Sequence, residues 1–363
     1  MNDLYTSSTL VKTKDVQEYI SELEDNKSII LHNDHNYRFA TKLFSLMEIY
    51  KILDIKQVED KHAIDEIPVC LCCGFYDSST FLNLTPIEEQ IYNILTTKFW
   101  PGTLHICVRA KTFVDSIVTF KDHYIMLNSS THRHIRKILE TIRMPLVTFL
   151  ANKKNHLPII SHKDLEYNYL SEHIPSMNQA QSNTVLNGIH NTTIMIENNT
   201  ITLLRRGPLA FNILQEHLNI NYTEHIHFKT DICIYPNISC TKPIYSFQLM
   251  DIHSNINDPT IIQELKTHTK QLLERVILID YHRTLVQYKE AFYGYVDLSE
   301  TGSIQEYIDN LYPALHTIMQ TECKKIYITD IQVKANGAFQ YVQDILEDVT
   351  NHKKMVIPMV CLQ

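Results

Sequence analysis

The order of short apolar runs and amphipathic stretches along the chain is the feature that most constrains its fold. Apolar residues at helical spacing predict helices, whereas runs of about 4–8 residues rich in Val, Ile and Leu predict buried strands. The expected helices cover 16–23, 40–53, 85–98, 133–142, a segment capped by Ser161, 259–274, 304–319 and 338–349. The expected strands cover 28–31, 69–73, 104–109, 124–127, 146–150, a hairpin over 193–204, 276–280, 293–297, 325–329 and 355–362. Strands that alternate with helices in this way indicate an α/β sheet protein.

The pattern changes near residue 217 and divides the chain into two parts. A chain of 363 residues is long enough for two domains. Helical and strand patterns fill 1–216, whereas 217–258 holds isolated apolar residues with Pro236 and Pro243, which is typical of a connector. From 259 to 363 the alternation returns, and this predicts a small α/β domain of ordinary size.

Glycine is scarce: the chain has 7, against about 25 expected for its length at average usage. Loops that bind phosphates through backbone amides need several glycines, because the ligand approaches the backbone closely. Neither GxGxxG nor GxxxxGK(S/T) occurs, so dinucleotide-binding and P-loop sites are not expected. Any nucleotide would be held largely by side chains. The formal net charge of −8 gives no support to a general nucleic-acid binder.

The sequence predicts a cytoplasmic, reduced protein. The first residues are polar and no run of about 18 apolar residues occurs, so neither a signal peptide nor a membrane span is expected. The 8 cysteines are scattered, as in proteins that keep their thiols reduced. Cys70, Cys72 and Cys73 lie in an apolar run typical of a buried strand, and no second CxxC or HxxxH motif accompanies them. No metal site is therefore expected.

The stretch 131–137, THRHIRK, gathers basic side chains at the start of a predicted helix. Arg133 and Lys137 share one face of that helix, as do His132 and Arg136. Such a face could bind the phosphates of RNA, double-stranded RNA included. The simpler interpretation is a solvated helix face.

Six segments resemble, in order, the motifs of the YrdC-like threonylcarbamoyl-AMP synthases. KFWPGTLHICVRA contains Trp100, Pro101 and Gly102 at the family's helix–break–strand signature. The other segments are SIILHNDHNYRFA, YKILDIKQVE, MPLVTFLAN, NTVLN and LLRRGPL. The second part resembles the C-terminal extension of the longer members. The resemblance therefore implies an α/β protein with a YrdC-like twisted mixed-sheet domain followed by a smaller Rossmann-like α/β domain.

The resemblance implies an enzyme of the nucleotidyltransferase type. Family members combine threonine, bicarbonate and ATP into threonylcarbamoyl-adenylate and pyrophosphate, and the product feeds a modification of tRNA adenosine. The implied ligands are ATP with Mg²⁺, threonine and bicarbonate. Because a carbamate attacks the α-phosphate, two anions must meet, and the site has to supply fixed cations.

The matched positions name the residues that would carry this chemistry. The resemblance assigns catalysis to Lys56 and Arg205, nucleotide binding to Lys56, Asn152, Thr184 and Arg205, and substrate binding to Asn33 and Tyr37. It assigns no protein ligand to a metal. Structural roles stay open for the same residues: Lys56 lies near a helix end, and Asn152 follows a strand as turn residues do.

Two cationic positions of the family are not cationic here. Val58 stands for the arginine of the KxR motif and Asn128 for an arginine of a strand motif. Losing one transition-state charge partner costs roughly 100- to 1000-fold in rate, so the site is expected to be partly eroded. Arg38 and Arg206 lie beside motif positions and could replace the lost cations. The alternative is a non-catalytic descendant that binds a nucleotide, RNA or a protein.

Overall fold

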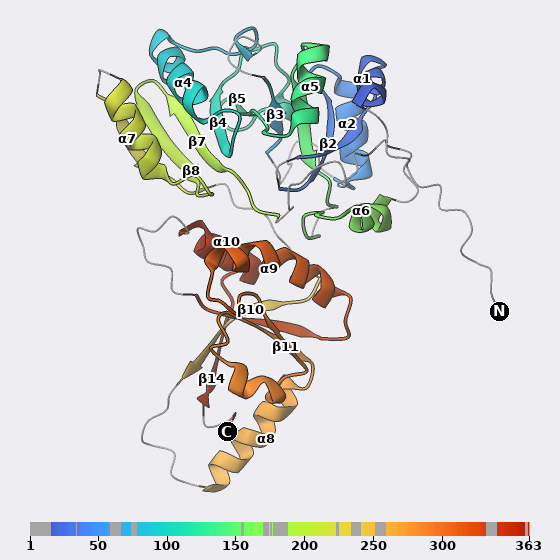
Figure 1. The fold of residues 1–363 in the computed structure, drawn as a ribbon, viewed down its shortest axis with the longest axis vertical. Helices are drawn as coiled ribbons and strands as arrows, with labels where there is room; N and C mark the ends of the chain where they lie inside the picture. Colours follow the sequence, from blue (N-terminus) through green and yellow to red (C-terminus); the bar gives the residue numbers. More distant parts are fainter. Residues whose placement is uncertain are drawn as a thin grey trace, which may run out of the picture.

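The chain forms two α/β units, drawn one above the other in Figure 1. The computed structural model describes residues 16–33, 35–58, 67–73, 78–153, 156–169, 174, 176, 188–222, 225–233, 241–250, 259–331, 340–359 and 362. Each unit is built on a sheet of its own.

The first unit is built on a mixed sheet. Within the described residues, nine strands pair in the order β1-β2-β6-β3-β5-β4-β7-β8-β9. Their bounds are β1 Ile29–His32, β2 Tyr37–Lys42, β3 Val69–Leu71, β4 Leu104–Arg109, β5 Tyr124–Asn128, β6 Leu146–Leu150, β7 Thr192–Glu197, β8 Thr200–Arg205 and β9 His227–Thr230. Antiparallel and parallel pairs both occur, which confirms the expected mixed sheet.

Helices cover both faces of this sheet. α1 (Val16–Glu24) and α5 (Arg133–Ile142) bury their apolar stripes in one core cluster. α2 (Leu46–Ile55), α4 (Pro86–Phe99) and α7 (Phe211–Asn221) pack into a second cluster. Successive strand residues alternate between the two clusters, as the pleat requires. α6 (His162–Tyr169) and the short 3-10 helix η1 (Ser116–Val118) lie in connections between strands.

The WPG motif forms a tight break between α4 and β4. The Trp100 indole Nε1 donates to the Leu104 carbonyl oxygen over 2.8 Å. A Cβ on Gly102 would lie 2.5 Å from the Phe99 carbonyl oxygen. Any other residue would clash there, so only glycine fits at this position. The motif shapes the fold at this point and supplies no reactive group.

The second unit has a parallel sheet. Its described strands pair in the order β12-β11-β13-β10-β14, and every pair is parallel. The strands are β10 Ile244–Met250, β11 Val276–Asp280, β12 Gly294–Asp297, β13 Lys325–Thr329 and β14 Lys354–Pro358; the helices are α8 Pro259–Leu273, η3 Val286–Ala291, α9 Ile304–Met319 and α10 Gln340–Thr350. α9 and α10 lie on the side that faces the first unit, and α8 lies on the far side (Figure 1). This confirms the expected Rossmann-like second unit.

Helix α9 docks the second unit against the first. A Cβ on Gly188, whose φ is +72°, would lie 2.7 Å from the Tyr312 ring, so glycine allows this close approach. The His316 Nε2 donates to the Pro158 carbonyl oxygen over 2.9 Å. The apolar core of the first unit continues into residues of α9 and α10. The two units therefore share a packed interface.

Two expectations about local structure are wrong. The segment 40–53, predicted as one helix, is the end of strand β2 followed by α2. β2 is buried along nearly its whole length, so it lacks the apolar–polar alternation that identifies a half-buried strand. The segment 217–258, predicted as an irregular connector, contains β9 and β10, which belong to different sheets. β9 is mostly exposed and polar, which hides it from a search for apolar runs. The domain limits themselves stay a prediction.

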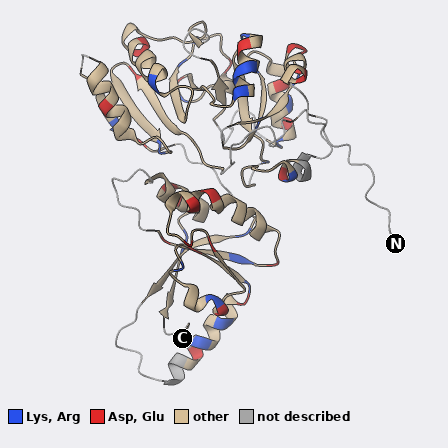
Figure 2. Cartoon of the chain, viewed as in Figure 1, with Lys and Arg blue, Asp and Glu red and all other residues tan. Residues whose placement is uncertain are grey.

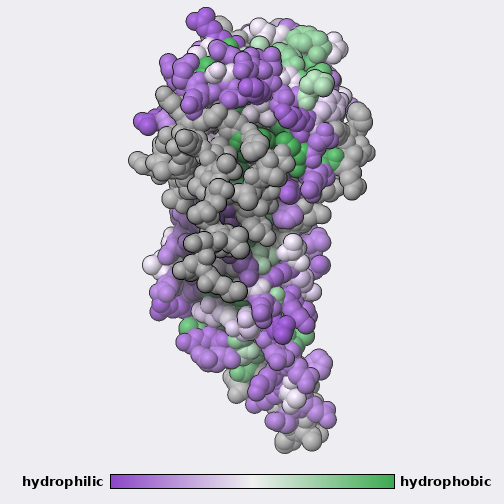
Figure 3. All heavy atoms as spheres, turned by 90° about the vertical axis from the view of Figure 1, so that its right-hand side faces the viewer, coloured by the Kyte–Doolittle hydropathy of each residue, from purple (hydrophilic) through white to green (hydrophobic). Residues whose placement is uncertain are grey.

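The surface mixes charge types. In Figure 2, Lys and Arg lie on several helices, α5 and α8 among them, with Asp and Glu nearby. The face drawn in Figure 3 is largely hydrophilic and carries separate hydrophobic patches. None of the helices in the described segments combines the length and the hydropathy needed to cross a membrane.

Candidate functional site

Lys56 and Asn152 come together in the first unit. Lys56 caps the C-terminal end of α2 and is only 5% exposed. Its Nζ donates to the carbonyl oxygen of Leu150 and, over 2.7 Å, to that of Asn152. These two carbonyls take two of the three ammonium donors and hold the positive charge at the end of β6.

The turn between β1 and β2 carries Asn33 and Tyr37. The Asn33 amide donates to the Asn36 carbonyl oxygen over 3.0 Å, and this bond closes the turn. The Asn33 side chain is buried, and its Oδ1 has no hydrogen-bond partner among the described residues. Tyr37 is fully buried in the core, and its carbonyl oxygen accepts from the Ala151 amide over 2.9 Å. The turn is therefore attached to the segment that contains Asn152.

His32 lines the same turn from the β1 side. Its ring lies 5.3 Å from the Tyr37 ring and 5.5 Å from the His132 ring, measured between centroids. Burial, followed by the nearby His132, lowers the pKa of His32 from 6.5 to about 4. The imidazole is therefore neutral near pH 7, and the fold holds it in that state.

Arg205 ends β8 and is buried. Its Nε donates to the Asn191 carbonyl oxygen over 3.0 Å, and its Nη2 lies 3.2 Å from His105 Nδ1. An arginine can only donate, so His105 Nδ1 is the acceptor and the imidazole is neutral. A Cβ on Gly207 would lie 2.3 Å from the Thr192 amide nitrogen, so glycine lets the chain after Arg205 pass close to β7.

Arg38 lies between the Lys56 and Arg205 regions. It pairs in strand register with Leu150, whose carbonyl oxygen accepts from Lys56. Its guanidinium is buried and donates from Nε to Thr148 Oγ1 over 2.9 Å and from Nη2 to the Thr148 carbonyl oxygen over 3.2 Å. A buried cation therefore lies near the start of β2, beside the turn that carries Asn33.

Four basic side chains form what we call the Arg–His cluster: the buried Arg38, Arg205 and His105, and the half-buried His190. Burial lowers the pKa of Arg205 from 12.5 to about 10, and the charge of Arg38 contributes to this shift. Burial and then the charges of Arg205 and Arg38 hold the pKa of His105 and His190 well below the usual range. Both guanidinium groups are therefore charged near pH 7, whereas both imidazoles are neutral. Such a concentration of positive charge favours binding of an anion.

The cluster is closed by contact between two loops. The Gly188 amide donates to the His35 carbonyl oxygen over 2.9 Å, which joins the β1–β2 turn to the segment preceding β7. His190 belongs to that segment, and His35 contributes to lowering its pKa. The turn that carries Asn33 therefore borders the cluster.

Several positions from the sequence do not join this group. Arg206 turns toward the second unit, where its Nη1 donates to both carboxylate oxygens of Asp344 over 2.8 and 3.0 Å. Asn128 donates from Nδ2 to the carbonyl oxygens of Gly102 and Leu104 and so supports the WPG break. Thr184 lies outside the described residues. Of the two arginines proposed as substitutes, Arg38 lies in the cluster and Arg206 does not.

His105 and His190 were not identified from the sequence. His105 is buried in strand β4, where apolar residues flank it on both sides. A buried histidine at such a position indicates a specific hydrogen-bond partner. His190 lies just before β7, and its place beside Arg205 depends on the β7–β8 pairing, in which Thr193 is the register partner of Arg205. No three His, Cys, Asp or Glu side chains of the described residues are grouped as a metal site.

Comparisons with known proteins agree with this architecture. The Sua5/YciO/YrdC family model, described as Telomere recombination, matches residues 21–207. A double variant of P. abyssi Sua5 is similar with a TM-score of 0.71 at 15% identity, over 94% of this chain and 94% of that chain. P. abyssi Sua5 complexed with L-threonine is similar with a TM-score of 0.70 at 15% identity, over 95% of this chain and 96% of that chain. A search of curated proteins found no match.

Proposed function

This chain belongs to the Sua5/YciO/YrdC family, and from that premise we propose that it joins threonine, bicarbonate and ATP into threonylcarbamoyl-adenylate and pyrophosphate. The observation that carries the proposal is the Arg–His cluster beside Lys56. Two buried guanidinium groups that repel each other cost free energy unless an anion balances them. The phosphates of ATP are such an anion, and side chains rather than a glycine-rich loop would hold them.

The reaction needs cations at the point where two anions meet. A carbamate oxygen of N-carboxythreonine attacks the α-phosphorus, the bond from that phosphorus to the bridging oxygen breaks, and pyrophosphate leaves with the electron pair. Arg205 and Arg38 would stabilise the charge on the phosphate oxygens, and Lys56 would act from the β6 side. Arg38 would thus take over part of the role of the arginines replaced by Val58 and Asn128.

The remaining ligands fit the same region. Asn33 Oδ1 is buried without a hydrogen-bond partner among the described residues, so it could accept from the ammonium or hydroxyl group of threonine. Mg²⁺ prefers oxygen ligands and often keeps waters while bridging substrate phosphates. Here the described residues supply no carboxylate cage, so the ion would be held mainly by ATP. A cytoplasmic location and a role in tRNA modification belong to the same proposal.

The test is pyrophosphate release from ATP in the presence of threonine, bicarbonate and Mg²⁺. We expect release to require all three substrates and to fall roughly 100- to 1000-fold in Lys56→Ala and in Arg205→Ala. Lys51→Ala, an exposed lysine of the same helix α2, and Arg136→Ala, an exposed arginine of α5, are the matched controls. Release that is unchanged in both site variants would reject these residue roles.

A non-catalytic role is the second candidate. The observation that favours it is Asn128, whose side chain is used by the fold at a position where the family has a cation. In that case ATP would bind to the Arg–His cluster with no pyrophosphate released. The exposed basic face of α5, with Arg133, Arg136 and Lys137, would be the place to look for RNA binding.

A further inference from the structure

Three polar side chains lie in one row across the sheet of the first unit. β4 and β8 both pair with β7, and strand register places His105 and Arg205 on either side of Thr193. Register partners on neighbouring strands carry their side chains on the same face of a sheet. All three residues are buried. The row therefore fixes where the His105 imidazole and the Arg205 guanidinium meet, inside the Arg–His cluster.

The protein occupies one edge of the Arg205 guanidinium. Its Nε donates to the Asn191 carbonyl oxygen over 3.0 Å, and its Nη2 donates to His105 Nδ1 over 3.2 Å. Nε and Nη2 form one edge of the planar guanidinium, whereas Nη1 and Nη2 form the other. Among the described residues these bonds use two of the five N–H donors of an arginine, so the second edge can still form a bidentate bond to a phosphate.

The Asn191 side chain determines which nitrogen of His105 carries the proton. His105 Nδ1 accepts from Arg205, so in the neutral imidazole the proton lies on Nε2. The Asn191 amide lies 3.1 Å from Nε2, and a protonated Nε2 needs an acceptor there. The amide oxygen is therefore the atom that faces His105, because an amide nitrogen would place two donors against each other. This orientation also gives Asn191 Oδ1 a partner, which it otherwise lacks among the described residues.

We propose that His105 is a positioning residue that acts through Arg205, an inference that rests on the proposed function. Asn191 holds His105 in the form protonated at Nε2, and Nδ1 then stays the acceptor that fixes the plane of the Arg205 guanidinium. The edge formed by Nη1 and Nη2 is thereby kept ready for the phosphates of ATP. A proton on Nδ1 would place two donors against each other and would turn the guanidinium out of this plane.

Two amides in place of His105 separate this role from simple packing. Asparagine places its amide oxygen near the position of Nδ1, so His105→Asn keeps an acceptor for Arg205. Glutamine places its amide near the position of Nε2, so His105→Gln keeps a partner for Asn191 but leaves Arg205 without that acceptor. Calorimetric titration of the full-length chain with ATP should give an affinity about tenfold weaker in His105→Gln, and most of it should return in His105→Asn.

A double-mutant cycle tests whether His105 acts through Arg205. In the Arg205→Ala background, His105→Gln should change the ATP affinity by less than about twofold, because the group that His105 positions is gone. Asn191→Leu is a second variant, which removes the acceptor for Nε2 and leaves His105 in place. It should weaken ATP binding about threefold or more, with the same dependence on Arg205.

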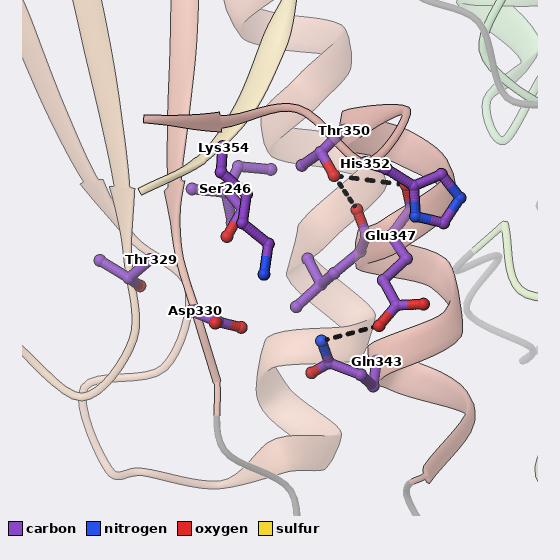
Figure 4. A pocket seen from close by; sticks show the side chains of 10 residues that line it. Ser246, Thr329, Asp330, Gln343, Glu347, Thr350, His352 and Lys354 are labelled. Carbon is purple, nitrogen blue, oxygen red and sulfur yellow. Dashed lines mark hydrogen bonds between the residues drawn. The ribbon is translucent and has the colours of Figure 1, made fainter. Parts of the chain in front are cut away.

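A hollow in the second unit is the control for the location of ATP. Figure 4 shows it between α10 and the strands β10, β13 and β14, with Lys354 as an exposed cation in its lining. Its described lining shares no residue with the row in the first unit. Lys354→Met should therefore leave the ATP affinity unchanged, and a loss of affinity in this variant would place ATP in the second unit and overturn the inference.

The outcomes separate this inference from the proposed function. If the unaltered chain binds ATP and both His105 variants bind it equally well, or equally poorly, the Nδ1 acceptor has no role and only the inference fails. The same holds if the effect of His105→Gln persists undiminished in Arg205→Ala. If His105→Gln does not fold, an unchanged affinity in Asn191→Leu overturns the inference instead. No ATP binding by the unaltered chain would overturn the proposed function, and the inference with it.

Discussion

At the scale of residues, Arg38 and Arg206 bind different partners, although both lie beside motif positions. Arg38 hydrogen-bonds to Thr148 and contributes to lowering the pKa of Arg205. Arg206 binds Asp344, which lies 138 residues further along the chain. The motifs assigned Lys56 and Asn152 to one site, and the two residues are in contact, but the motifs could not choose between the two arginines. That choice depends on a partner from the second unit, which no local pattern reveals.

The assignment of Arg38 predicts a large kinetic effect. Because its guanidinium would face the phosphate charge in the transition state, Arg38→Ala should lower kcat/KM for ATP roughly 100- to 1000-fold. Arg38→Lys should recover part of the loss, because lysine restores the charge but cannot form the bidentate hydrogen bonds of a guanidinium group. The measurement is the initial rate of pyrophosphate release, with Arg136→Ala as the control. A rate equal to that of the unaltered chain would exclude Arg38 from the site.

His32 predicts a dependence of stability on pH. Its pKa is about 4 in the folded chain and 6.5 ordinarily, so between these values the unfolded chain binds a proton that the folded chain does not. The free energy of unfolding should therefore fall as the pH drops from about 6.5 toward 4, with a contribution from His32 of up to about 3 kcal/mol. His105 and His190 act with the same sign.

The measurement is urea unfolding at about pH 7 and pH 5, in the unaltered chain and in His32→Phe. The aromatic replacement keeps the ring contacts and removes the titrating group. The loss of stability between these two pH values should be smaller in His32→Phe by about 2 kcal/mol. An identical loss in both proteins would mean that His32 does not titrate as described.

At the scale of elements, caps and apolar runs were the reliable signals. The helices expected over 85–98 and 304–319 are α4 and α9, and Thr85 and Ser303 cap their first turns. The signals failed where tertiary contacts decide the structure. β2 carries Arg38, Thr41 and Lys42 in a largely buried strand, and its pairing with β1 and β6 on either side makes this segment a strand. β9 is an exposed edge strand whose sequence, HFKT, carries no apolar pattern.

The α4 cap predicts a difference between two neighbouring glutamates. Glu88 accepts from the Thr85 amide over 2.7 Å and from the Asn198 amide over 2.8 Å, so it joins the cap to the β7–β8 hairpin. Glu88→Ala leaves both amides without this partner and should cost about 1–3 kcal/mol, whereas Thr85→Ala should cost about 1 kcal/mol. Glu89→Ala, at the exposed next position, should cost under about 0.5 kcal/mol. Urea unfolding measures all three, and equal costs for the two glutamates would contradict this role.

At the scale of the whole molecule, the ion pair between Arg206 and Asp344 links the two units. Asp344 lies on α10, and the two side chains are 33% and 19% exposed. An ion pair that is partly buried and joined by two hydrogen bonds should show a coupling energy of about 1–2 kcal/mol. The measurement is a double-mutant cycle of Arg206→Ala and Asp344→Ala. The exposed pair Arg283 and Glu300 is the control and should give a smaller coupling energy, because solvent screens exposed charges. No coupling at Arg206 would mean that packing around Gly188 and Tyr312 holds the units together without it.

The central claim is that the Arg–His cluster is a binding site for the phosphates of ATP, and calorimetric titration of ATP tests it most directly. We predict saturable binding to the unaltered chain, weaker at higher salt, and a loss of affinity of at least about tenfold in Arg38→Ala and in Arg205→Ala but not in Arg136→Ala. ATP affinity that is the same in all four proteins would contradict the claim.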